Sequence, residues 1–192
     1  MNSMSLLVQR EFLLKGKPVA TLSGNEFSRK EGVTLTQQVV EYYNSIGNKA
    51  ISPVYGEVIL DKKGVDDDFA HGVSRIKAIA FAAVPQIIEK GIVILPFGKY
   101  KEDEKIFSAM IAAPVSIARK EYIEVVVLRQ NKMGDNRLYV HEVSLKEKLL
   151  ESATQRVEKK SLNGSSNPTL LLATNQGAVA KVLQKILLAK SD

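Results

Sequence analysis

The sequence predicts an α+β fold in which helices of the first half pack on a four-stranded antiparallel β-meander, followed by a C-terminal helical extension. Two stretches, 34–47 and 74–91, carry apolar residues at helical spacing. Four segments rich in Val, Ile, Tyr and Phe then follow between residues 92 and 145. The chain has 192 residues, of which 45% are hydrophobic and 25% charged, so it can build a globular core.

The division into parts follows from this pattern. Glycines and a proline break the first 33 residues into short pieces, so we expect an N-terminal extension over 1–33. A single α+β domain is expected over 34–145, and the C-terminal helical extension over 146–192.

The first clear helix begins at a capping threonine. Thr34 or Thr36 can accept from free N–H groups of the first turn, and Gly47 can end the helix. A short strand is predicted over 57–61, and residues 62–64 are predicted to turn the chain.

The second helical stretch contains a proline. Pro85 lacks the N–H that the helix ladder needs and crowds the carbonyl four residues earlier. We expect a kink, or two helices with Pro85 in the first turn of the second, and an end at Gly91.

Four strands are predicted next, over 92–97, 105–117, 122–130 and 137–145. Their short connections favour antiparallel pairing between neighbours. Pro114 suggests an edge position or a bulge in the second of them. After residue 145 a helix is expected over about 146–160, and a last amphipathic helix over 177–190 either docks on the domain or binds a partner.

Composition narrows the function classes. Without cysteine there is no disulfide framework and no thiolate metal site, and with two histidines we expect no metal and no cofactor. A net charge of +6 favours polyanionic partners. No apolar run approaches the ~20 residues that span a bilayer, so a cytoplasmic protein without a membrane partner is expected.

One strand carries residues suited to phosphodiester chemistry. Because strand side chains alternate, Arg137, Tyr139 and His141 are predicted on one face, with Leu138 and Val140 on the other. An imidazole moves protons near neutral pH, an arginine clamps phosphate, and a tyrosine stacks on a base or bonds a phosphate. The alternative is the solvent-exposed polar face of a half-buried sheet.

A second polar cluster surrounds the other histidine. His71 precedes a predicted helix start, and Ser74 and Arg75 can share a face with it. Lys77 could reach a phosphate from another side. The alternatives are a turn histidine, a capping serine and solvated cations.

Together these residues suggest metal-independent RNA cleavage. His71 and His141 would supply the base and the acid of transesterification, with Lys77 and Tyr139 completing the catalytic set. Ser74, Arg75 and Arg137 would bind the substrate. The nucleophile would be a 2′-hydroxyl, so RNA is the expected partner.

Parts of the sequence resemble a domain of phage polyvalent proteins and minor head proteins. The resemblance covers roughly residues 35–145 and is carried by the segments Gly56–Val65, Phe69–Lys77, Ala80–Gly91, Ala112–Val115 and Leu138–Val143. It implies the fold of the barnase, EndoU and RelE-like (BECR) ribonucleases, with His71, Lys77, Tyr139 and His141 as the matched polar positions. It also implies a phage or mobile-element toxin or effector, countered by an inhibitor, an immunity protein or a phage protein. The sequence departs from it at residues 97–101, which lack the family's tryptophan, and in its basic helical tail.

Three other functions stay open at this stage. The chain could be a non-catalytic phage accessory that binds nucleic acid or a protein. It could be an ADP-ribosyltransferase, although Glu142 would then lie on the strand face opposite His141. It could also be an interaction module that works through the helix over 177–190.

Overall fold

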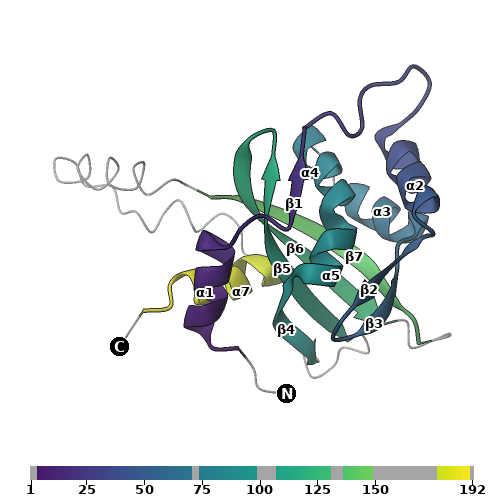
Figure 1. Cartoon of the computed structure of the whole chain (residues 1–192). Helices are drawn as coiled ribbons and strands as arrows, with labels where there is room; N and C mark the ends of the chain where they lie inside the picture. The colour runs from purple at the N-terminus through teal and green to yellow at the C-terminus, as the bar shows by residue number, and fades with distance from the viewer. Residues whose placement is uncertain (1–3, 71–73, 99–106, 131–135, 149–176, 191–192) are drawn as a thin grey trace.

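The main feature of the fold is a mixed seven-stranded sheet with helices on both faces (Figure 1). The computed structural model describes residues 4–70, 74–98, 107–130, 136–148 and 177–190. The strand order is β1-β5-β6-β7-β3-β2, and β4 also pairs with β5. The sheet curls into a half-barrel whose inner face is covered by α2, α3, α4 and α5 (Figure 1).

The helices are α1 (Leu6–Lys15), α2 (Leu35–Ser45), α3 (Lys62–Phe69), α4 (Arg75–Ala80), α5 (Val84–Lys90) and α7 (Ala178–Leu187), with a 3₁₀ turn at Phe81–Ala83. The strands are β1 (Ala20–Leu22), β2 (Lys49–Ser52), β3 (Gly56–Ile59), β4 (Ile92–Gly98), β5 (Ser108–Ile117), β6 (Lys120–Gln130) and β7 (Leu138–Glu147).

The predicted four-stranded antiparallel fold with N-terminal helices is wrong. Strands β4 to β7 do pair consecutively and antiparallel, but they are only the middle of the sheet. β1 joins β5 in parallel, β3 joins β7 in parallel, and β2 extends the sheet beyond β3. β1 and β2 have three and four residues, too few for a recognisable alternating pattern.

The sequence correctly predicts where two of the helices begin. Thr34 caps α2 in a capping box with Gln37, and Pro85 lies in the first turn of α5 after a break, both as predicted. Residues 62–64 were predicted as a turn but begin α3, with Asp61 as the N-cap. Gly64 and the acidic residues that follow it are weak helix formers, so the sequence did not indicate this helix.

Pro114 lies neither at an edge nor in a bulge. Its carbonyl accepts a hydrogen bond from the Val19 N–H at 2.8 Å. The N–H that proline lacks would point to the same side of β5 as this carbonyl, which is the side that β1 occupies. On that side of β5 the ladder with β4 ends at Ala112, and the ladder with β1 begins at Val115. The proline therefore occupies the junction at which one neighbouring strand replaces the other, and no ladder donor is missing there.

Two hydrophobic cores lie on opposite faces of the sheet. The larger one joins the inner face to α2–α5, with Tyr43, Phe81 and Ile87 buried at its centre. The smaller one lies on the outer face, beneath α1 and α7, which lie side by side (Figure 1). α1 and β1 fall within the predicted extension over 1–33, and both pack on β5.

The C-terminal part of the chain is helical where it is described. α7 confirms the helix predicted over 177–190, and it docks on the outer face of the sheet. The helix predicted from residue 146 is wrong at its start because β7 continues to Glu147. The rest of that prediction lies outside the described residues. In the part of the chain that the structure covers, no helix has the length and apolarity to cross a bilayer.

Candidate functional site

The candidate site lies on β7, where a β-bulge interrupts the strand at His141. Val127 of β6 pairs with Glu142 and Leu128 pairs with Val140, so His141 is the additional residue. Val140 and Val143 both enter the main core although they are three positions apart. His141 and Glu142 are therefore both excluded from the core side of the strand, and His141 is half-buried.

Before the bulge the predicted alternation holds. Leu138 and Val140 pack in the main core, as predicted, so Tyr139 between them points to the outer face. Tyr139 pairs with Arg129 of β6 and with Ile59 of β3. Arg137 is exposed immediately before the strand.

A lysine that the sequence interpretation missed covers the tyrosine. Lys63 Nζ lies 5.6 Å from the centroid of the Tyr139 ring, within the range of a cation–π contact. The two residues come from segments 76 positions apart, and no sequence signal pairs them. With Arg129 and Arg137, the start of β7 combines one aromatic ring with three cations.

The first turn of α3 is fixed to β7 at van der Waals contact. A Cβ on Gly64 would lie 2.0 Å from the Val140 carbonyl oxygen, so only glycine allows this approach. Asp61 caps the turn by accepting from the Gly64 N–H at 3.0 Å. The relative placement of Lys63 and Tyr139 thus follows from backbone packing.

Lys77, predicted as a catalytic cation, is held by a buried carboxylate. Its Nζ donates to Asp68 Oδ1 at 2.8 Å, and the Asp68 side chain is only 5% exposed while that of Lys77 is 27% exposed. Burial raises the pKa of Asp68, and the Lys77 ammonium only partly opposes this rise. The pair links α3 to α4, and both helices pack on β7.

The remaining predicted residues are placed as follows. Ser74 is the N-cap of α4 and accepts from the Lys77 N–H at 3.3 Å, which agrees with the capping alternative. Arg75 is exposed on the first turn of the same helix. His71 lies outside the described residues. The site is thus a β7 surface bordered by the ends of α3 and α4.

Glu142 is engaged beside the bulge. Its Oε1 accepts from the Ser144 hydroxyl at 2.9 Å, a contact between residues two positions apart on one strand face. Strict alternation would have placed Glu142 opposite His141, and the bulge removes that opposition. No feature of the sequence around residue 141 indicates a bulge.

A buried carboxyl in the main core was also missed. Glu124 on β6 is fully buried, and neither carboxylate oxygen has a hydrogen-bond partner in the described structure. Burial raises the pKa of Glu124 well above the ordinary value. Burial, together with the nearby Glu124, also raises the pKa of Tyr43. Its position inside the core makes it a structural residue and separates it from the β7 surface.

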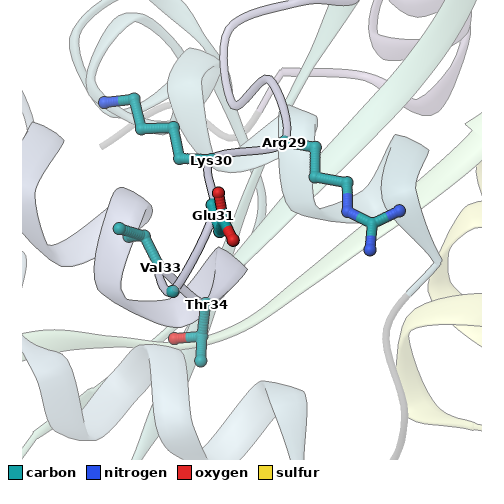
Figure 2. A pocket seen from close by; sticks show the side chains of 6 residues that line it. Arg29, Lys30, Glu31, Val33 and Thr34 are labelled. Carbon is teal, nitrogen blue, oxygen red and sulfur yellow. The ribbon is translucent and has the colours of Figure 1, made fainter.

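A depression of about 790 Å³ lies along the loop before α2, lined by residues 29–34. Figure 2 shows the Arg29 and Lys30 side chains extending in opposite directions from this loop. They therefore do not converge on a shared ligand, and the depression is remote in sequence from the β7 site.

Comparison with known proteins identifies no relative of this chain. The chain matches no protein-family model, and no curated protein and no solved structure shows significant similarity to it.

Proposed function

We propose that the chain binds RNA on the β7 surface and cleaves it by acid–base catalysis through His141. The β-bulge at His141 is the observation that carries this proposal. Bulges are frequent next to active sites, where they redirect a side chain out of the regular alternation. Here the redirected residue is an imidazole, the side chain best suited to proton transfer near neutral pH.

The proposed chemistry needs two proton transfers. A base takes the proton of the 2′-hydroxyl, whose oxygen attacks the phosphorus, and the bond from phosphorus to the 5′-oxygen breaks. An acid protonates that oxygen, which gives a 2′,3′-cyclic phosphate and a 5′-hydroxyl end. His141 serves as one of these groups, and His71 is proposed as the other. Tyr139 and Arg137 contact the substrate phosphates.

A cleavage assay with a labelled single-stranded RNA in EDTA tests the proposal. His141→Ala should lower the cleavage rate by about 10²–10⁴-fold. His71→Ala should lower it to a similar extent if the second histidine takes the other role. Ile51→Ala, at an exposed residue of β2, serves as the control and should leave the rate unchanged. Wild-type cleavage that survives both histidine substitutions would contradict the mechanism.

The ion pair that Lys77 forms favours a second function. Its ammonium is bound to Asp68, so it is not presented to a phosphate as an uncompensated charge. Such a surface suits an accessory protein that binds nucleic acid without cutting it. Its signature would be salt-sensitive RNA binding with no cleavage product at any protein concentration.

A further inference from the structure

We infer that Lys63 is a substrate-binding residue that contacts an RNA phosphate beside Tyr139; this inference rests on the proposed RNA-binding function. Lys63 lies in the exposed first turn of α3, with its ammonium over the tyrosine ring. Through Lys63, α3 adds a cation to the strand surface that carries Tyr139 and His141.

The lysine is held in place by its backbone. The contact between Gly64 and the Val140 carbonyl fixes the adjacent residue relative to β7, and the Asp61 cap fixes the direction of the turn. A flexible side chain that starts from a fixed Cα and rests on a ring loses less freedom when it binds a ligand. The arrangement therefore favours phosphate binding at a defined place.

The charge of Lys63 is also not neutralised by the described part of the chain, where no ion pair involves it. Its neighbour Lys62 differs, because its Nζ contacts Asp66 Oδ2 at 2.6 Å. A lysine ammonium binds phosphate as a point charge. Two adjacent lysines of one helical turn thus offer a matched comparison of a cation that forms an ion pair and a cation that forms none with the described side chains.

The lysine also limits the role of Tyr139. One face of the ring is covered by the ammonium, so that face is closed to stacking by a base. The phenol is then better placed to bond a phosphate that Lys63 attracts than to sandwich a base. We therefore expect binding that depends on backbone charge more than on base identity.

Binding of a 2′-O-methyl RNA oligonucleotide, which lacks the attacking hydroxyl, tests the inference without cleavage. Fluorescence anisotropy at several salt concentrations gives Kd and its salt dependence. Lys63→Ala should raise Kd at least about fivefold and reduce the salt slope by about 0.7, the loss of one phosphate contact. Lys62→Ala should change Kd less than about twofold because the Asp66 carboxylate beside Lys62 repels a phosphate there, and Lys63→Arg should bind like the wild type.

The outcomes separate the two proposals. Equal effects of Lys63→Ala and Lys62→Ala, with RNA bound by the wild type, would overturn the inference and leave the proposed function intact. Absence of RNA binding and of cleavage by the wild type would overturn both. Circular dichroism of each variant confirms that the helix is retained.

Discussion

At the scale of single residues, the most unusual group is Glu124, a carboxyl buried in the main core with no hydrogen-bond partner among the described residues. Its folded-state pKa is raised above the unfolded value of 4.5. Between those two pKa values the folded protein binds more protons than the unfolded chain, so stability falls as pH rises through this interval. The neutral acid is the form that the core tolerates.

We predict that the free energy of unfolding declines above pH 4.5 with a slope that approaches about 1.4 kcal/mol per pH unit for this group. Glu124→Gln should flatten this decline. Urea denaturation at a series of pH values measures it. Asp68, whose pKa is also raised, adds a decline of the same sign, so the comparison of interest is the wild type against Glu124→Gln. Parallel pH profiles for the two proteins would contradict the prediction.

Gly64 gives a second prediction at this scale. In Gly64→Ala the new methyl group would collide with the Val140 carbonyl, and we expect a loss of about 1–3 kcal/mol of stability because α3 must move away from β7. Gly98→Ala is the control, since a Cβ there would meet only the Pro96 carbonyl oxygen, at an ordinary contact distance of 3.9 Å. Thermal unfolding compares the two variants, and equal stabilities would show that α3 adapts without cost.

The sequence predicted part of the site for an identifiable reason. The faces of Leu138, Tyr139 and Val140 follow from strand periodicity alone. The bulge at His141 depends on how β7 registers with β6, which no local pattern encodes. The contact of Lys63 with Tyr139 depends on tertiary packing of a helix that the sequence did not indicate.

At the scale of elements, the sequence again predicts what local signals determine and misses what tertiary packing determines. α2 and α5 begin where a capping threonine and a first-turn proline place them, and these are local signals. β1 and β2 are too short to show a period, and α3 has a composition that favours turns. These elements form because the sheet and the main core stabilise them, so a window of sequence contains little information about them.

The ion pair between Asp68 of α3 and Lys77 of α4 predicts that the two single substitutions differ in their effect on stability. The Asp68 side chain is only 5% exposed, and the cost of burying its carboxylate offsets the attraction to Lys77, so we expect the ion pair to add little net stability. Lys77→Met removes the partner of a buried carboxylate, and we expect a loss of about 1–3 kcal/mol at neutral pH that becomes smaller as pH falls.

The reverse substitution should be milder. In Asp68→Asn the partly exposed Lys77 can turn toward solvent, and the Asp68→Asn/Lys77→Met double variant should lie close to the wild type. A double-mutant cycle by urea denaturation measures all four proteins. Equal losses in the two single variants would contradict this account. Cleavage rates of the same variants show whether Lys77 also acts on the substrate.

At the scale of the whole molecule, one sheet contributes side chains to two hydrophobic cores. The helices α1 and α7 together cover the smaller core on the outer face. α1 and α7 lie side by side on it, and the Arg10 side chain donates to the Leu187 carbonyl at 3.1 Å. Lys148, at the end of β7, donates to the Leu14 carbonyl at 3.2 Å. Because strands β5 and β6 contribute side chains to both cores, loosening one core should be transmitted to the other.

We therefore predict that the protein unfolds in a single transition that includes α7. Leu183→Ala, at a residue only 4% exposed, should lower the free energy of unfolding by about 2–4 kcal/mol without splitting the transition. Leu188→Ala, five residues later and 59% exposed, should change the free energy of unfolding by less than about 0.5 kcal/mol. Urea titrations followed by far-ultraviolet circular dichroism and by tyrosine fluorescence report on helices and on the main core respectively. If the dichroism of Leu183→Ala falls at a lower urea concentration than the fluorescence, α7 detaches on its own, and the outer core is a separable layer instead of part of the cooperative unit.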